Sequence, residues 1–168
     1  MKKKIKQVVI IIVTVVGTFQ VQAQNHKSDL SYVSHVDFSA DKVWEQIRKM
    51  DNIDKISSFV GKVEWIGPKG IGGTRVCTAP DGKGKFKEKI MKFDDSDRTY
   101  TWQVVEGVPA KKVENSFRVV DMGLNKSMIV WTSNYEFLKN PNMTEIQFRA
   151  FLQRAVTEMV ENMVGFIK

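Results

Sequence analysis

Apolar and polar residues alternate along the chain between Val60 and Phe137, and one long helical pattern follows, from Asn142 to Lys168. Alternation places every second side chain on the same face of a strand, so this region predicts antiparallel strands with one buried and one exposed face. A curved sheet of this kind that wraps around one helix leaves space between the two. The pattern therefore predicts a binding cavity, although it does not identify the molecule that fills it.

The first residues have the pattern of a secretory signal peptide. An apolar run covers Val8–Phe19, small residues at Val21 and Ala23 suit a signal peptidase, and a basic head precedes the run, with Lys2, Lys3, Lys4 and Lys6. The run is shorter than the roughly 20 residues of a permanent membrane span. We expect residues 1–23 to be a cleaved signal peptide, residues 24–168 to form a single domain, and the protein to be periplasmic or secreted. An uncleaved anchor is the alternative.

The net charge and the cysteine content limit the classes of protein to which the chain can belong. The formal net charge of the whole chain is +7, and because residues 1–23 hold four lysines and no acids, it falls to +3 without them. A basic surface for nucleic acid is therefore not expected. The single cysteine, Cys77, cannot form an internal disulfide, so packing must provide the stability of the domain.

The first half of the domain predicts strands separated by two short helices. Ser39 can cap a helix that ends near Met50, in which Val43, Trp44 and Ile47 share one face. The other expected elements are the strands Leu30–Phe38, Phe59–Ile66 and Thr74–Ala79 and a helical turn over Ile53–Ser57.

Counting residues across the turns predicts which residues lie opposite each other. The Pro80–Lys83 loop places Cys77 opposite Phe86 and Arg75 opposite Glu88. Later turns pair Ile90 with Trp102, Glu88 with Val104, Trp102 with Asn115, and Asn115 with Trp131. The resulting inner face is apolar and contains Ile90, Tyr100, Trp102, Val104, Val113, Phe117, Ile129, Trp131 and Tyr135.

The closing helix carries a start signal and one apolar stripe. Thr144 and Gln147 have the spacing of a capping box. The stripe contains Phe148, Phe151, Leu152, Ala155, Val156, Met159, Met163 and Phe166. It can be buried only against the apolar face of the sheet.

A series of short motifs in a fixed order carries a resemblance to a known family. The motifs are Ser39-Ala40 before a Val43-Trp44 helix, Gly72-Gly73-Thr74-Arg75, Asp81-Gly82, a Glu88 strand ending in Phe93-Asp94, Gly107-Val108-Pro109, Val130-Trp131-Thr132 and the long final helix. Their order resembles the polyketide cyclase/dehydrase and lipid-transport branch of the START-like, or SRPBCC, superfamily, over nearly all of residues 24–168.

The resemblance implies an α+β, helix-grip fold. In this fold a curved seven-stranded antiparallel sheet wraps around a long C-terminal helix, and two short helices follow the first strand. It also implies an internal cavity for lipids, hormones or polyketide-like rings. It implies little about catalysis, because similar proteins include carriers, receptors, chaperone-like proteins and a few cyclases.

Two loops resemble those that cover the cavity mouth in related ligand receptors. They are Ala79–Gly84 and Glu106–Ala110, and ordinary hairpin connections are the alternative. Asp81-Gly82 is a plain turn where the receptors carry a more apolar gate.

The polar residues of the inner face are the most informative candidates for binding. Arg75 can orient a ligand carboxylate, phosphate or carbonyl while Glu88 holds its guanidinium, or the two can be a structural pair. Asn115 can bind a ligand carbonyl or a buried water. The full set of expected cavity residues is Arg75, Cys77, Glu88, Ile90, Tyr100, Trp102, Val104, Asn115, Phe117, Trp131, Phe148, Leu152, Ala155 and Met159.

Signals for enzymatic chemistry are few. The only histidines are His26 and His35, so the sequence predicts no catalytic triad, no metal site and no cofactor. Gly70-Ile71-Gly72-Gly73 lacks the third glycine and the βαβ context of a dinucleotide-binding fingerprint.

Three hypotheses about function follow. The first is an exported protein that binds or transports a small hydrophobic or amphipathic ligand, lipid-like or polyketide-like. The second is a cyclase or dehydratase in which Arg75, Glu88 or Tyr100 supplies polarisation or proton transfer. The third is an accessory protein that binds another exported protein and no small ligand. All three predict no nucleic-acid partner and no permanent membrane span once the signal peptide is removed.

Overall fold

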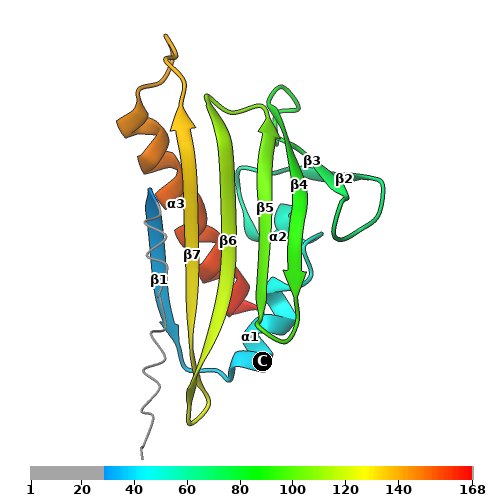
Figure 1. The fold of residues 1–168 in the computed structure, drawn as a ribbon, viewed down its shortest axis with the longest axis vertical. Helices are drawn as coiled ribbons and strands as arrows, with labels where there is room; N and C mark the ends of the chain where they lie inside the picture. Colours follow the sequence, from blue (N-terminus) through cyan, green and yellow to red (C-terminus); the bar gives the residue numbers. More distant parts are fainter. Residues whose placement is uncertain (1–28, 168) are drawn as a thin grey trace, which may run out of the picture.

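The alternating pattern forms one curved antiparallel sheet. The computed structural model describes residues 29–167, whose seven strands follow the spatial order β1-β7-β6-β5-β4-β3-β2 (Figure 1). The strands are β1 Leu30–Val36, β2 Lys62–Ile66, β3 Thr74–Thr78, β4 Lys85–Asp94, β5 Thr99–Glu106, β6 Ala110–Gly123 and β7 Lys126–Phe137. The helices are α1 Ala40–Ile47, α2 Ile53–Ile56 and α3 Glu145–Gly165. The predicted helix-grip architecture is therefore confirmed.

The expected signal peptide, residues 1–23, lies outside the described residues, so its cleavage and the location that it implies stay predictions. No helix within residues 29–167 has the length and apolar character needed to cross a membrane.

All three helices lie on the inner face of the sheet (Figure 1). Ser39 caps α1, because its side chain accepts a hydrogen bond from the Lys42 amide at 3.5 Å. The buried face of α1 holds Val43, Trp44 and Ile47, as predicted. The helix ends at Ile47 rather than near Met50, and Met50 itself has a φ of 50°, outside the helical region.

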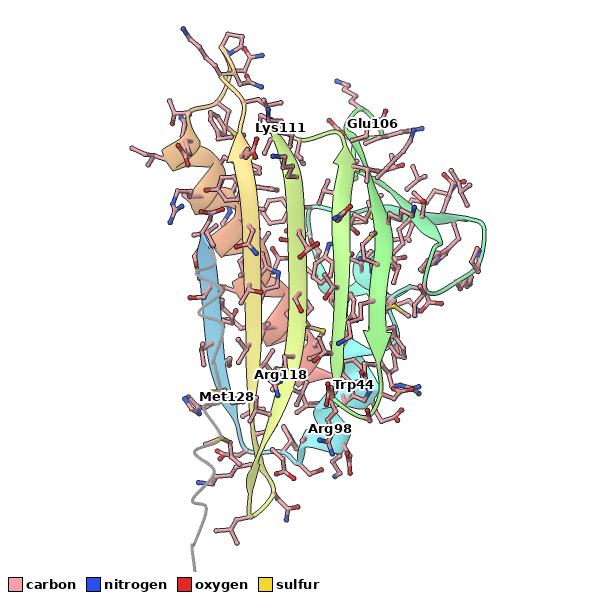
Figure 2. All side chains as sticks on the ribbon, in the orientation of Figure 1. Trp44, Arg98, Glu106, Lys111, Arg118 and Met128 are labelled. Atoms are coloured by element: carbon pink, nitrogen blue, oxygen red, sulfur yellow. The ribbon has the colours of Figure 1, made fainter. Side chains whose placement is uncertain are left out.

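The registers of the middle strands match the predicted ones. Arg75 pairs with Glu88, Cys77 with Phe86, Ile90 with Trp102, Glu88 with Val104, and Trp102 with Asn115. The outer face is polar and solvated, and it presents residues such as Arg118 (Figure 2) and Lys89, Gln103 and Glu114.

One predicted register is wrong. Asn115 pairs with Ser133 rather than Trp131, and Trp131 pairs with Phe117. The cause is a tight turn at Leu124 and Asn125, both with positive φ, beside a bulge between Asp121 and Gly123. The shift is two residues, so Asn115 and Trp131 still face inward.

A second bulge changes the face of one aromatic residue. Ile90 pairs with Trp102 and Lys92 with Thr101, so Met91 is the extra residue in β4. Beyond the bulge the alternation is reversed, and Phe93 points inward to stack on Trp44, with ring centroids 5.6 Å apart. Bulges also bend a strand, which contributes to the curvature of this sheet around α3.

The two halves of α3 have different neighbours. Val160 and Met163 in the C-terminal half are buried in the main core with Trp44 and Ile129. Val160 was not predicted in the buried stripe, whereas Phe166 was and is 51% exposed, because it follows the last helical residue, Gly165. The N-terminal half packs Phe148 against Tyr135 in a smaller cluster. The cavity lies beside this half.

The predicted capping box at the start of α3 is present, and it should contribute to the stability of the fold. Thr144 accepts a hydrogen bond from the Gln147 amide at 3.3 Å, and Gln147 accepts one from the Thr144 amide at 2.8 Å. We expect Thr144→Ala to lower the free energy of unfolding by about 1 kcal/mol, because it removes the cap. Urea denaturation measures this loss. Thr144→Ser keeps the hydroxyl and should behave as the wild type, and an equal loss in both variants would contradict the role of the cap.

Candidate functional site

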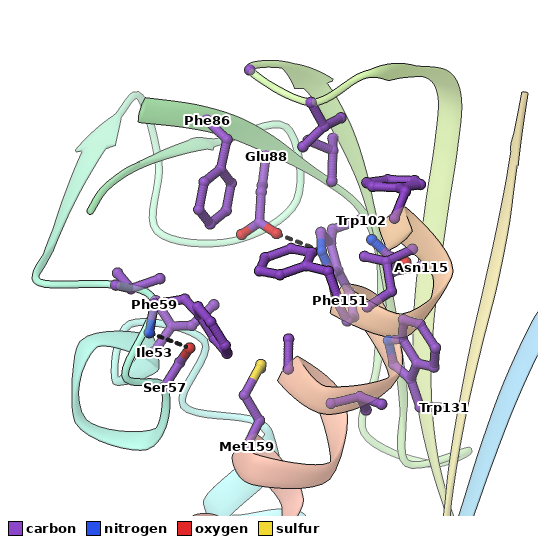
Figure 3. Close-up of a pocket in the computed structure, with 18 of the residues that line it drawn as sticks. Ile53, Ser57, Phe59, Phe86, Glu88, Trp102, Asn115, Trp131, Phe151 and Met159 are labelled. Atoms are coloured by element: carbon purple, nitrogen blue, oxygen red, sulfur yellow. Dashed lines mark hydrogen bonds between the residues drawn. The ribbon is translucent and has the colours of Figure 1, made fainter. Parts of the chain in front are cut away.

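A cavity of about 290 Å³ lies between the sheet and the N-terminal half of α3 (Figure 3). Its walls come from β4 to β7, from α3, from the connection between α2 and β2, and from the β5–β6 loop. Sites for small molecules usually occupy about 300–1,000 Å³, so this cavity suits a compact ligand.

The structure brings most of the expected cavity residues together. Those that line it are Glu88, Trp102, Val104, Asn115, Trp131, Phe148, Leu152, Ala155 and Met159. The others are buried outside the lining: Arg75, Cys77, Ile90, Tyr100 and Phe117. That any of these residues binds a ligand stays a prediction.

Several lining residues lie in connections that alternation cannot place. Val108 and Pro109 line the cavity from the Glu106–Ala110 loop, whereas no residue of the Ala79–Gly84 loop does. In the sequence, Gly107 was the residue that could have indicated the close approach of this loop to the sheet. Gly107 has a φ of +94°, and a Cβ there would lie 2.2 Å from the Lys85 carbonyl oxygen. Only glycine lets this loop pass so close to the start of β4.

An aromatic pair forms the wall between the α2–β2 connection and α3. Phe59 and Phe151 line the cavity and pack edge to face, with centroids 5.0 Å apart. Glu158 on α3 accepts hydrogen bonds from the amide and, at 2.9 Å, the hydroxyl of Ser58. Asn162 donates to the Ile56 carbonyl at 2.9 Å. These bonds fasten the connection to the helix and close this side of the cavity.

The most polar feature of the interior is the buried ion pair of Arg75 and Glu88. Arg75 Nη2 lies 2.8 Å from Glu88 Oε2, and the two side chains are 1% and 6% exposed. Arg75 Nη1 donates to the Met50 carbonyl at 2.6 Å. Burial is the largest single influence on the guanidinium and by itself would lower its pKa, but the Glu88 carboxylate together with Tyr100 and Cys77 outweighs burial, so the pKa is raised. Arg75 is therefore charged, and Glu88 balances it.

Glu88 is held by two further donors. The Trp102 indole Nε1 donates to Oε1 at 2.7 Å (Figure 3), and the Cys77 thiol lies 3.7 Å from Oε2. Trp102 also stacks on Tyr100, with centroids 4.8 Å apart. Neighbours from the two adjacent strands, β3 and β5, thus fix the orientation of this carboxylate at the cavity wall.

Asn115 is another polar residue of the wall, between Trp102 and Trp131 (Figure 3). The residue is 4% exposed, and its Oδ1 is buried without a hydrogen-bond partner. An unsatisfied buried polar atom costs about 1–3 kcal/mol. A water molecule or a ligand that supplied the missing bond would recover this energy.

The described part of the chain places few groups for acid–base or metal chemistry. His35 is exposed on β1. Residues 29–167 contain no cluster of three or more His, Cys, Asp or Glu side chains that could hold a metal ion. Tyr100 does not line the cavity, and burial raises the pKa of its phenol.

The ion pair predicts a large loss of stability when one partner is removed. We expect Arg75→Met to lower the free energy of unfolding by about 3–5 kcal/mol, because it leaves Glu88 charged and buried. The double variant Arg75→Met, Glu88→Gln should recover most of this loss, since it removes both charges. Urea denaturation of the two variants compares them. A double variant as unstable as the single one would contradict this account.

The single cysteine predicts resistance to thiol reagents. Cys77 is fully buried, and burial together with the nearby Glu88 carboxylate raises the pKa of its thiol. Because the thiolate is the reactive form, Cys77 should stay unmodified by DTNB at pH 8 in the folded protein and react at once in urea. Rapid modification without denaturant would show that the pocket around Cys77 opens.

Comparison with known proteins places this geometry in a family. Residues 27–165 match the family profile described as polyketide cyclase / dehydrase and lipid transport. No curated protein sequence matches the chain.

Similar solved structures share the architecture at low sequence identity. Truncated norcoclaurine synthase from Thalictrum flavum is 21% identical, with a TM-score of 0.67 over 80% of this chain and 89% of that one. The protein XoxI from Bacillus cereus is 15% identical, with a TM-score of 0.70 over 82% and 94%. The Zhui aromatase/cyclase from a Streptomyces species is 16% identical, with a TM-score of 0.65 over 81% and 90%.

At these identities the solved structures establish the fold alone, whereas the family profile covers most of the chain. The chain therefore belongs to the polyketide cyclase/dehydrase and lipid-transport family of the START-like, or SRPBCC, superfamily.

Proposed function

We propose that this protein is an exported carrier that holds a small hydrophobic or amphipathic molecule in the cavity between the sheet and α3. The observation that carries the proposal is the wall itself, which is built mainly from aromatic and aliphatic side chains with a few polar groups. Binding sites for small molecules have this composition, since apolar burial supplies affinity and the polar groups fix orientation.

The size of the cavity is consistent with useful affinity. A ligand that buries about 200 Å² of apolar surface gains about 5 kcal/mol at roughly 25 cal/mol per Å². Part of this gain is lost with the free movement of the ligand, so shape and polar contacts decide the final affinity. Export is supported by the signal-like pattern of residues 1–23.

A cyclase-like or dehydratase-like enzyme is the second candidate, because Glu88 presents a carboxylate at the cavity wall. Two of the similar structures are named as a synthase and an aromatase/cyclase, which gives this candidate some support. A general base, however, must reach a substrate proton. Glu88 is held by Arg75, Trp102 and Cys77, and the described lining contains no second acid–base side chain to exchange that proton with, so we favour binding.

Filling the cavity tests the proposed function. Ala155 lines the cavity, and we expect Ala155→Phe to weaken the binding of a small apolar fluorophore such as 1-aminoanthracene by at least about tenfold. A fluorescence titration measures this change. Ala150 lies on the same helix but is exposed outside this cavity, so Ala150→Phe is the matched control and should bind like the wild type.

Thermal unfolding of both variants shows whether the added ring disturbs the fold. If the fluorophore does not bind the wild type, or if folded Ala155→Phe binds it equally well, the proposed function is wrong.

A further inference from the structure

We infer that the cavity selects a neutral or cationic ligand with a hydrogen-bond donor, such as a phenol, an alcohol or an amine, and rejects carboxylates. This inference rests on the proposed function and specifies its ligand class. It reverses the expectation that Arg75 receives a ligand carboxylate.

The position of the charges in the ion pair carries the inference. Among the described residues that line the cavity, Glu88 is the one with a charged side chain. Its partner Arg75 is buried outside the lining, and its guanidinium contacts Glu88 and the Met50 carbonyl. Figure 3 shows the Glu88 carboxylate directed into the cavity beside Phe86 and Phe151. A ligand therefore meets the negative member of the pair.

The hydrogen bonds of Glu88 indicate how many donors a ligand can add. A carboxylate has about four lone-pair positions. Oε2 faces Arg75 and Cys77, and Oε1 accepts from Trp102 alone. One position on Oε1 is unused. A single hydroxyl or amine of a ligand can fill it, and a hydrogen bond to a charged acceptor is stronger than one between neutral groups.

A ligand carboxylate would meet a different environment. It would bring a second negative charge beside Glu88 in an interior of low dielectric, where like charges repel strongly. It would also lose its hydration, because the remaining wall is largely apolar and Arg75 is buried outside the cavity lining. Free fatty acids and other carboxylates should therefore bind poorly.

Asn115 provides a second polar contact for the same ligand. It lies two strands from Glu88, on β6, at about 4.8 Å per strand. Its Oδ1 has no partner, and rotation of the amide can present either its oxygen or its NH₂ group to the cavity. The expected ligand thus has an apolar body with a donor at Glu88 and room for a second polar group near Asn115.

Three naphthalene derivatives of nearly equal size test the inference at neutral pH. They are 2-naphthol, with a neutral donor, 2-methoxynaphthalene, with no donor, and 2-naphthoate, with a carboxylate. Each competes with 1-aminoanthracene for the wild-type protein. We expect 2-naphthol to bind at least about tenfold more tightly than either of the others, because it alone can donate to Glu88.

Variants identify the group responsible for this selectivity. The double variant Arg75→Met, Glu88→Gln removes both charges, so the ratio of 2-naphthol to 2-naphthoate affinity should fall at least about tenfold. Lys89 follows Glu88 on β4 but is exposed on the outer face, and Lys89→Gln should leave the ratio unchanged.

The outcomes separate the two proposals. If the protein binds 1-aminoanthracene, but binds 2-naphthoate as tightly as 2-naphthol or more tightly, the inferred ligand class is wrong. The proposed function then still stands. Absence of binding by every probe overturns the proposed function together with the ligand class. If the double variant does not fold, the three wild-type affinities still decide between these outcomes.

Discussion

The buried ion pair of Arg75 and Glu88 connects the parts of this structure that surround the cavity. Arg75 on β3 binds the Met50 carbonyl after α1 and the Glu88 carboxylate on β4. Glu88 in turn accepts the indole N–H of Trp102 on β5. Burying either charge alone would be unfavourable, so the strands and the α1–α2 connection are held in the one arrangement that satisfies both.

This arrangement also determines the chemistry of the cavity. The guanidinium is buried outside the cavity lining, where it contacts Glu88 and the Met50 carbonyl, whereas the carboxylate borders the cavity beside aromatic rings. The cavity lies beside the N-terminal half of α3, where Phe148 and Phe151 form part of its wall. In the C-terminal half of the helix, Val160 and Met163 are buried in the main core instead. A wall of this kind favours an apolar molecule with few polar groups.

Much of the fold could be predicted because its signals are local. The caps at Ser39 and Thr144 and the register across the Ala79–Gly84 hairpin depend on residues close in sequence. The error in strand register occurs at a bulge and a tight turn, and the other errors concern the end of α1 and the stripe of α3. Because of the turn at Leu124-Asn125, Asn115 pairs with Ser133 and not with Trp131 as predicted. The alternation of apolar and polar residues does not indicate such irregularities. For the site, the strand and helix residues were largely predictable. Val108 lies in a connection that has no periodicity, and Phe59, expected at the start of a strand, lies in the connection before β2.

The sequence by itself determined that Arg75 lies opposite Glu88 and that Trp102, Asn115 and Trp131 share the inner face, because side chains alternate with a period of two along a strand. Only the tertiary structure decided which member of the ion pair borders the cavity. That choice depends on the Met50 carbonyl, which a turn after α1 brings to the guanidinium from 25 positions away in the chain. Contacts between segments so far apart follow from packing, and no local pattern encodes them.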